Sequence, residues 1–416
     1  MRIFKFGGAS VKDAEGIKNL VEVLNKVGYD DTLIVVSAMG KTTNALEKVL
    51  YNYFKETMAL KSSVQEVKTF HNNVLIDLFK NDQHPIFKKI ADLFADLDEF
   101  LSRNKSPDYN YVYDQVVGYG ELISTSIISS YLNDIGLANT WIDVRDYIKT
   151  DSYHRNAKVD WKRTQDQITK NIDRNKLNIT QGFLGSDINN FTTTLGREGS
   201  DYTAAIFAYV LNANSVTIWK DVPGVLNADP RHFDHAQLIN KISYREAIEL
   251  AFYGASVIHP KTLQPLQRKE IPLFVKSFNN PENDGTRVGK GIKIDPEIPC
   301  YIVKKDQVLI SLSSLDFSYI VEGNISHIFS LLHQYKMKVD VIQNSAISFS
   351  VCVDNIYNNL DKLLQHLKAK FKVSCHENVS LYTIRHYNLN SIKQLEQDKT
   401  VLLKQLTPET VQIVTK

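Results

Sequence analysis

The sequence predicts an α/β protein in which a mainly parallel central sheet is covered by helices on both faces, giving three layers. A ferredoxin-like α+β region follows it. Two observations indicate the first part: short apolar runs alternate with helical patterns over about residues 1–296, and polar glycine turns follow several of these runs. The second part is indicated by a β-α-β-β-α-β order within residues 297–416.

The strands of the first part are expected in short apolar runs bounded by glycines and polar residues. These runs cover residues 3–6, 32–36, 140–144, 177–181, 216–218 and 273–275. Helical spacing predicts helices at 11–27, 113–128 and 204–211, and a helical layer over 42–101 that breaks near residue 84. Ser10 is the expected N-cap of the first helix. We read His71 as a surface residue, because it has no partner at metal-binding spacing.

The sequence pattern changes after about residue 295, where glycine loops give way to regularly spaced strands and helices. One fairly complete β-α-β-β-α-β unit is expected over about 305–380. A truncated unit over about 381–416 follows and stops before its last helix and strand. We expect this region to be a regulatory or dimerisation module, and the protein to be a homodimer or a higher homo-oligomer.

Composition argues against several classes of function. Lys and Arg number 49 against 47 Asp and Glu, for a net charge of +2, and no basic patch stands out, so neither nucleic acid nor a membrane is an expected partner. No apolar run approaches the ~20 residues of a membrane span. Cys300, Cys352 and Cys375 have no paired spacing, which argues against a disulfide framework and a zinc site. We expect reduced thiols in a cytoplasmic protein and assign no residue to a metal.

A glycine pair, Gly7-Gly8, links the first strand to the first helix. This geometry presents backbone N–H groups to a phosphate, and Lys5 adds a positive charge beside it. Two other glycine motifs are decoys. Gly40-Lys41-Thr42 lacks the earlier glycine of a P-loop, and Gly118-Tyr119-Gly120 lacks the third glycine of a dinucleotide fingerprint.

The stretch from Thr193 to Ala205 turns on two glycines and enters an apolar helix. It carries Arg197, a rigid fork for a carboxylate or a phosphate, and Asp201, an acceptor for an amine or a metal. Taken alone, it is equally consistent with a helix that an aspartate caps. Glu121 lies beside glycines inside a predicted helix, which indicates that a ligand or a neighbouring backbone approaches closely there.

With these pieces placed, the chain resembles the aspartate kinases of the amino-acid kinase superfamily, with a C-terminal ACT-like regulatory region. Five motifs carry the resemblance: Lys5-Phe6-Gly7-Gly8-Ala9-Ser10, Val36 to Asn44, Gly120-Glu121-Leu122, Leu195-Gly196-Arg197-Glu198-Gly199-Ser200-Asp201, and Asp221-Val222-Pro223-Gly224 with Asp229-Pro230-Arg231. They occur in order over about the first 295 residues.

The resemblance implies transfer of a phosphoryl group from Mg²⁺-ATP to the side-chain carboxylate of L-aspartate, the first step towards lysine, threonine and methionine. It implies catalytic roles for Lys5 and Asp201, with Mg²⁺ held largely by phosphate oxygens and water. The implied substrate-binding residues are Thr43, Glu121, Arg197 and Ser200, with Ser37 near the reacting carboxylate. The implied nucleotide-binding residues are Lys5, Gly7, Gly8, Lys220, Asp221, Arg231 and Lys276.

The chain departs from the family pattern at four positions. Ala9 replaces a threonine, Glu198 replaces a glycine beside Arg197, and Ser256 stands where many members carry lysine. In the first ACT-like unit, Ala346 falls where lysine-inhibited relatives often have glutamate, so lysine, threonine or no effector remain open.

Two alternative functions remain open at this point. The first is another amino-acid kinase, acting on glutamate or N-acetylglutamate. The second is a non-catalytic amino-acid sensor, which the substitutions at Ala9 and Ser256 would favour. A fused homoserine dehydrogenase, as some relatives have, is not expected, because a nicotinamide fingerprint is not evident.

Overall fold

A computed structural model describes residues 1–255, 258–316 and 318–416. The chain forms two compact units. The first contains Met1–Val225, Leu238–Ile248 and a segment that ends at Ile294. The second contains Asp295–Lys416 together with Leu226–Gln237 and a short segment that begins at Glu249. The second unit's main segment thus begins near the boundary predicted at residue 296, but two shorter segments of the predicted first domain also belong to it.

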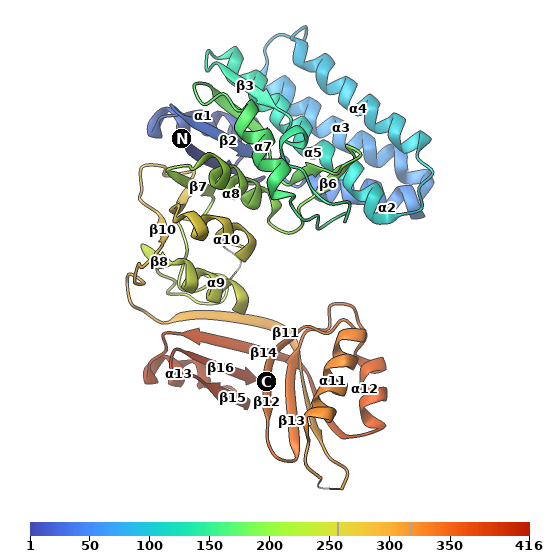
Figure 1. The fold of residues 1–416 in the computed structure, drawn as a ribbon, viewed down its shortest axis with the longest axis vertical. Coiled ribbons are helices and arrows are strands. Elements are labelled where there is room, and N and C mark those ends of the chain that lie inside the picture. The colour runs from blue at the N-terminus through green and yellow to red at the C-terminus, as the bar shows by residue number, and fades with distance from the viewer. Residues whose placement is uncertain (256–257, 317) are drawn as a thin grey trace. The chain divides into compact units, whose positions relative to one another are not determined.

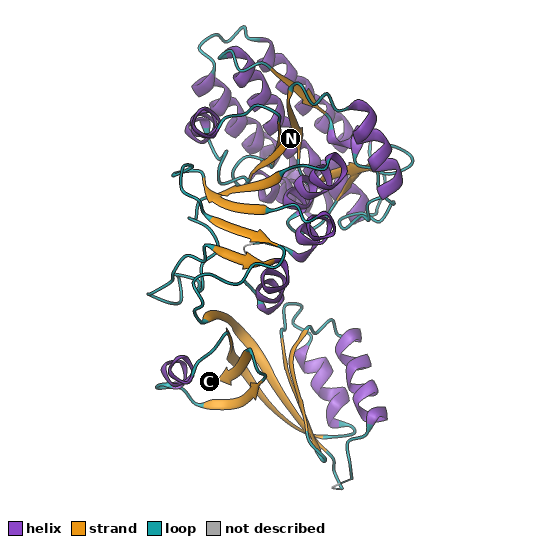
Figure 2. Ribbon diagram, turned by 60° about the vertical axis from the view of Figure 1, so that its left-hand side comes forward, coloured by secondary structure: helices purple, strands orange, loops and turns teal. Residues whose placement is uncertain are grey.

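The first unit is built on an eight-stranded sheet (Figures 1 and 2). In spatial order its strands are β3 (Asn139–Ile142), β4 (Leu177–Gln181), β2 (Thr32–Val36), β1 (Arg2–Phe6), β7 (Ser215–Lys220), β9 (Leu273–Ser277), β10 (Thr286–Gly289) and β8 (Lys241–Ser243). Neighbouring strands from β3 to β9 are parallel, and β10 is antiparallel to β9. The predicted mainly parallel sheet is therefore confirmed.

Helices cover both faces of this sheet and confirm the three predicted layers. Against one face lie α1 (Ala14–Val27), α2 (Thr42–Lys55), α3 (Thr57–Leu78), α4 (Pro85–Arg103) and α5 (Tyr109–Asp134). Against the other lie α7 (Trp161–Asn171), α8 (Gly199–Leu211) and α10 (Pro260–Lys269). Shorter elements are α6 (Val144–Tyr147), α9 (Tyr244–Tyr253) and the hairpin of β5 (Leu184–Ser186) and β6 (Thr192–Thr194).

The strands that carry the predicted ligand turns end in register. Gln181 of β4 pairs with Val36 of β2, Val36 pairs with Phe6 of β1, Phe6 pairs with Trp219 of β7, and Trp219 pairs with Lys276 of β9. Parallel strands that end in register bring the loops that follow them to one edge of the sheet. The turns that follow β1, β2, β4 and β7 therefore meet at this edge.

Two local predictions in the first unit are wrong. Helix α1 begins at Ala14 and is capped by Asp13, whose Oδ1 accepts a hydrogen bond from the Gly16 N–H at 2.8 Å, whereas Ser10 donates its hydroxyl proton to the Trp219 carbonyl. His71, predicted to lie at the surface, is fully buried in α3 between aromatic rings. Its position on the apolar stripe of the helix decided its burial.

The second unit is a six-stranded antiparallel sheet with helices. Its strands are, in spatial order, β12 (Val339–Asn344), β13 (Ser348–Val353), β11 (Cys300–Ser313), β14 (Lys372–Arg385), β16 (Thr410–Thr415) and β15 (Val401–Leu406). Helices α11 (Glu322–Gln334) and α12 (Leu360–Lys368) pack on one half of the sheet, and α13 (Leu389–Glu396) on the other. The predicted ferredoxin-like topology is present in the first half.

The second half-sheet requires a correction to the predicted truncated unit. Residues 300–304 of β11 pair with residues 381–385 of β14, so a segment that precedes the first ferredoxin-like unit supplies the fourth strand of the second. Both β11 and β14 are 14 residues long because each serves both halves. Chain order alone did not predict this pairing. In the described part of the chain, no helix has both the length and the apolar character that a membrane span requires.

Candidate active site

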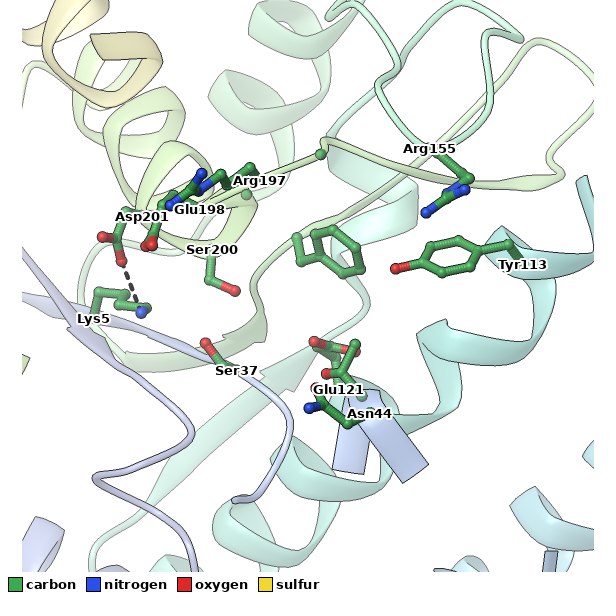
Figure 3. Close-up of a pocket in the computed structure, with 14 residues that line it drawn as sticks. Lys5, Ser37, Asn44, Tyr113, Glu121, Arg155, Arg197, Glu198, Ser200 and Asp201 are labelled. Carbon is green, nitrogen blue, oxygen red and sulfur yellow. Dashed lines mark ion pairs between the residues drawn. The ribbon is translucent and has the colours of Figure 1, made fainter. Parts of the chain in front are cut away.

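A cavity of about 530 Å³ opens at the edge of the first unit's sheet where β1, β2 and β4 end (Figure 3). Its polar lining brings together most of the residues that the sequence predicts for a site. The lining residues are Lys5, Ser37, Thr43, Asn44, Tyr113, Glu121, Arg155, Phe183 and the run Gly196-Arg197-Glu198-Gly199-Ser200-Asp201. Residues separated by almost 200 positions in the sequence therefore share one cavity.

An ion pair between Lys5 and Asp201 lies at one end of the cavity. The Lys5 Nζ is 2.7 Å from the Asp201 Oδ1, and the Asp201 side chain is fully buried at the start of α8. The Lys220 Nζ is 3.9 Å from the other carboxylate oxygen. Burial alone would raise the pKa of the Asp201 carboxyl, but the two ammonium groups outweigh burial and hold the pKa below its ordinary value. Asp201 is therefore ionised and keeps Lys5 at the cavity wall.

Glu198, whose place beside Arg197 the sequence left unexplained, points its carboxyl group towards Asp201 (Figure 3). Burial and then the charge of Asp201 raise the pKa of Glu198, because two neighbouring carboxylates resist simultaneous ionisation. Its backbone is left-handed, with a φ of 55°, at the N-cap of α8. Glu198 thus opposes Arg197 less than a fully ionised glutamate would.

Glu121 presents a buried carboxyl group to the cavity from α5. It is 3% exposed, its Oε1 accepts a long hydrogen bond of 3.4 Å from the Ala38 N–H, and its Oε2 has no hydrogen-bond partner in the described part of the chain. Burial raises the pKa of Glu121 to about 8. A buried acceptor without a partner is costly, so this oxygen favours a ligand that donates hydrogen bonds, such as an ammonium group.

The glycines around these residues are required by close backbone contacts. A Cβ atom at Gly8 would lie 2.8 Å from the carbonyl oxygens of Ala38 and Gly40, and the Gly40 N–H donates to the Gly8 carbonyl at 3.0 Å. The loops after β1 and β2 are therefore joined. At Gly120, a Cβ would lie 3.0 Å from the Ala38 side chain, which is the close approach that the sequence predicts beside Glu121.

Four of the predicted nucleotide-binding residues do not line this cavity, and they lie at different places in the structure. Lys220 ends β7 near Asp201, Asp221 follows it on the exposed turn, and Lys276 lies on the adjacent strand β9, where its Nζ donates to the Pro281 carbonyl at 3.4 Å. Arg231 belongs to the second unit, where it forms an ion pair of 2.6 Å with Asp229. Its predicted contact with a nucleotide therefore stays a prediction.

Two further predicted positions also fall outside the cavity lining. Gly7 and Gly8 lie on the loop that follows Lys5 but do not line the cavity, and Ala9 is exposed. Ser256, where the family often has lysine, lies outside the described residues.

Four lining residues were not predicted from the sequence: Asn44, Tyr113, Arg155 and Phe183. Three of them carried a usable signal. Asn44 follows Thr43, Phe183 follows the glycine after β4, and Tyr113 lies on the helix that carries Glu121. Arg155 lies in a loop without any motif, so its place in the cavity could not be predicted.

Comparison with known proteins decides the family. The sequence profile of the amino acid kinase family matches residues 1–277. Over 400 residues, the chain is 30% identical to the lysine-sensitive aspartokinase 3 of Escherichia coli, covering 92% of this chain and 86% of that protein. The chain is an aspartokinase of the amino acid kinase family. The family resemblance drawn from the five sequence motifs is thereby confirmed.

Solved aspartokinase structures agree with this assignment. E. coli aspartokinase III, solved in complex with lysine and aspartate, superposes with a TM-score of 0.82 at 28% identity, covering all of this chain and 95% of that one. The same enzyme with aspartate and ADP gives a TM-score of 0.82 at 27% identity. The chain spans only 42% of the bifunctional aspartokinase/homoserine dehydrogenase 1 of Arabidopsis thaliana, to which it is 28% identical.

Proposed function

We propose that this aspartokinase transfers the γ-phosphoryl group of ATP to the side-chain carboxylate of L-aspartate, giving 4-phospho-L-aspartate and ADP. This reaction opens the pathway to lysine, threonine and methionine. One observation carries the proposal: a single cavity joins a buried lysine–aspartate ion pair to an arginine and to a buried carboxyl that lacks a partner. The ion pair of Lys5 and Asp201 suits a transferring phosphate, and Arg197 together with the Glu121 carboxyl suits a free amino acid.

This reaction requires mainly that the protein position the two substrates and supply positive charge. A carboxylate oxygen of the substrate attacks the γ-phosphorus, a P–O bond forms, and the bond to the ADP oxygen breaks. Because the attacking carboxylate is already ionised, no group has to remove a proton. Catalysis then rests on positioning and on positive charge near the phosphoryl oxygens. Lys5 supplies that charge, and the buried Asp201 fixes its ammonium group at 2.7 Å.

The substrate's other groups are assigned to the remaining lining residues. Arg197 is exposed, and its guanidinium forms no ion pair with any described carboxylate, so it is available to a carboxylate of the substrate. Thr43 and Ser200 donate hydrogen bonds from the first turns of α2 and α8. Glu121 accepts the ammonium group with its free oxygen.

The nucleotide is assigned to the row of strand ends beside Lys5. Lys220, Asp221 and Lys276 lie on adjacent strands β7 and β9 or on the turn that follows β7, and Gly7-Gly8 precede them on β1's loop. In the described part of the chain no three acidic, histidine or cysteine side chains form a metal site. A site with few protein ligands fits Mg²⁺, which usually keeps water and substrate phosphates as ligands and takes only one or two carboxylates. Bound with ATP, Mg²⁺ neutralises phosphate charge.

We assign the second unit to regulation by an amino-acid effector and to subunit contacts. Lysine is present in the solved E. coli aspartokinase III, which supports an effector of this class. Titration of lysine and threonine against the initial rate tests the assignment, and identical rates at every concentration of both would contradict it. The three cysteines form no disulfide, which supports a cytoplasmic location.

An ATP-dependent hydroxamate assay tests the proposed substrate. Aspartate, glutamate and N-acetylglutamate are compared at equal concentrations with hydroxylamine as the trap for the acyl phosphate. We expect hydroxamate with aspartate alone. Turnover of glutamate or N-acetylglutamate in place of aspartate would assign the chain to another amino-acid kinase activity, and turnover of none would favour an amino-acid sensor.

A further inference from the structure

Asp114 is a fully buried carboxylate on helix α5 that does not line the cavity. Thr194, the last residue of β6, donates to it twice, from its hydroxyl group at 2.7 Å and from its backbone N–H at 3.1 Å. The Arg155 N–H donates to both carboxylate oxygens at 3.1 Å, and the His154 Nδ1 lies 3.0 Å from one of them. Two segments that are far from α5 in the sequence therefore converge on one buried side chain.

The chemistry of these contacts favours the ionised form of Asp114. The hydroxyl and the N–H of Thr194 and the N–H of Arg155 all direct a proton at the carboxylate. Burial raises the pKa of the Asp114 carboxyl, and the hydrogen bonds from Thr194, Arg155 and His154 oppose this rise. Hydrogen bonds to a charged acceptor are roughly twice as strong as those to a neutral one, so the carboxylate holds the two segments more firmly than an amide would.

Asp114 shares its helix with Glu121, the proposed acceptor for the substrate ammonium. The two residues lie seven positions apart, which is about two helical turns, so they lie on the same side of α5. Their burial agrees with this placement, because Asp114 is fully buried and Glu121 is 3% exposed. A segment that is bound to Asp114 is therefore held at a fixed place relative to Glu121.

Thr194 leads directly into the loop that carries Arg197. Arg197 follows three residues later, its side chain is exposed, and it forms no ion pair with a described carboxylate. The position of its guanidinium therefore depends on the backbone of this loop. Since Thr194 is bound to Asp114, the loop starts from a point that is fixed to α5.

Other contacts join the same segments through neutral groups. Gln115, the next residue of α5, exchanges two hydrogen bonds with the Thr192 backbone, of 2.8 and 3.3 Å. The Ala157 N–H donates to the Thr194 carbonyl at 2.9 Å, which joins the loop of residues 154–157 to β6. Asp114 is charged and binds both segments at once, so it contributes more to their placement than these neutral contacts do.

We propose that Asp114 is a positioning residue that fixes Arg197 relative to Glu121 and thereby sets the affinity of the enzyme for L-aspartate. This inference rests on the proposed function, in which the substrate contacts both residues at once. A misplacement of about 1 Å between groups that act on one small molecule can cost about 100-fold. Asp114 acts through Thr194 and does not itself contact the substrate.

The experiment measures thermal midpoints and initial rates with L-aspartate and ATP for four variants. D114N replaces the carboxylate by a neutral group of the same shape. T194V removes the hydroxyl donor and keeps the backbone N–H, whereas T194S keeps both donors and is the conservative variant. S129A is the matched control, because it removes a hydrogen bond of 2.6 Å to Asn139 from a buried serine of the same helix, outside the cavity lining.

We expect D114N to raise the KM for aspartate about tenfold, because a neutral acceptor weakens several hydrogen bonds at once. T194V raises this KM about fivefold, and T194S raises it at most about twofold. The kcat and the KM for ATP stay within about threefold of wild type, since Lys5 is fixed by Asp201 and not by Asp114. S129A keeps the wild-type KM for aspartate although its thermal midpoint falls.

Two results would overturn the proposal: a KM for aspartate that neither D114N nor T194V changes, or a rise that S129A reproduces at an equal fall in the thermal midpoint. An equal rise in the KM for ATP counts against it as well, because that rise would show a general distortion of the cavity. If D114N does not fold, the comparison of T194V with T194S decides alone.

A wild type that binds aspartate but does not phosphorylate it would contradict the proposed function instead. The calorimetric affinities of D114N and T194V for aspartate, measured without ATP, then decide whether Asp114 sets the affinity. A wild type that binds no aspartate would overturn both proposals.

Discussion

The raised pKa of Glu121 predicts how aspartate binding depends on pH. Glu121 is the acceptor proposed for the substrate ammonium, and it serves only when ionised. Burial raises its pKa to about 8 in the free protein. The stabilising contact with the ammonium is therefore half available at pH 8, approaches completeness well above it, and is lost as the pH falls below it.

The size of the effect follows from the ionised fraction. With a pKa of about 8, roughly 3% of Glu121 is ionised at pH 6.5 and about half at pH 8.0. An apparent dissociation constant scales inversely with the competent fraction, so the KM for aspartate should be about 15-fold higher at pH 6.5 than at pH 8.0. Each further unit below pH 7 adds a factor of about ten.

The assay is the KM for aspartate between pH 6.0 and 8.5 at saturating ATP. E121Q should bind aspartate weakly at every pH, with little slope, because its amide does not titrate. E99Q, which changes an exposed glutamate on α4, should keep the wild-type slope. Calorimetry in two buffers of different ionisation enthalpy should find about one proton released per aspartate bound at pH 7 by the wild type. A flat wild-type KM, or an E121Q variant with the wild-type slope, would refute the reasoning.

Three other predictions concern single residues. K5M should lower kcat at least 100-fold, and it should lower the thermal midpoint by several degrees. The variant leaves the buried Asp201 with only the more distant ammonium of Lys220, which lowers the free energy of unfolding by about 3 kcal/mol. An unchanged midpoint would contradict the importance of the ion pair. Burial lowers the pKa of His71 to about 4, so the stability that depends on its neutral form is complete above pH 6.5 and falls by about 2–3 kcal/mol as the pH approaches 4. Thermal unfolding of wild type and H71Q at pH 7.5 and 4.5 should show that the variant loses this part of the acid sensitivity. An equal drop in the thermal midpoint of both proteins between the two pH values would contradict the prediction. G8A should raise the KM for ATP and destabilise the protein by about 1–3 kcal/mol, because its methyl group would lie 2.8 Å from two carbonyl oxygens. If the variant unfolds and turns over ATP like wild type, the loop moves to accommodate the methyl group and the prediction is wrong.

Local signals in the sequence predicted much of the fold. Glycine turns after apolar runs located β1, β2 and β4, and the in-register ends of these strands follow from their parallel pairing. The start of α1 was misplaced by three residues, because both Ser10 and Asp13 are good caps and only tertiary contacts choose between them. The shared strands β11 and β14 could not be predicted, since pairing across 80 residues leaves no local trace.

In the candidate site, too, residues that belong to motifs could be predicted, and a residue placed by long-range contacts could not. Lys5, Glu121, Arg197 and Asp201 each belong to a motif with a chemical reason for its residues, and the cavity contains all four. Arg155 belongs to no motif. Its place in the cavity depends on hydrogen bonds from its backbone to a buried aspartate 41 residues away, which a reading of neighbouring residues cannot detect.

The most direct test of the account follows the phosphoryl group itself. Wild-type protein is incubated with Mg²⁺, ATP labelled at the γ-phosphorus and L-aspartate, and the labelled products are separated with and without hydroxylamine. The account predicts label in an aspartyl phosphate that hydroxylamine destroys, and no such product from K5M. Label that appears only as inorganic phosphate, or that transfers to glutamate but not to aspartate, would contradict it.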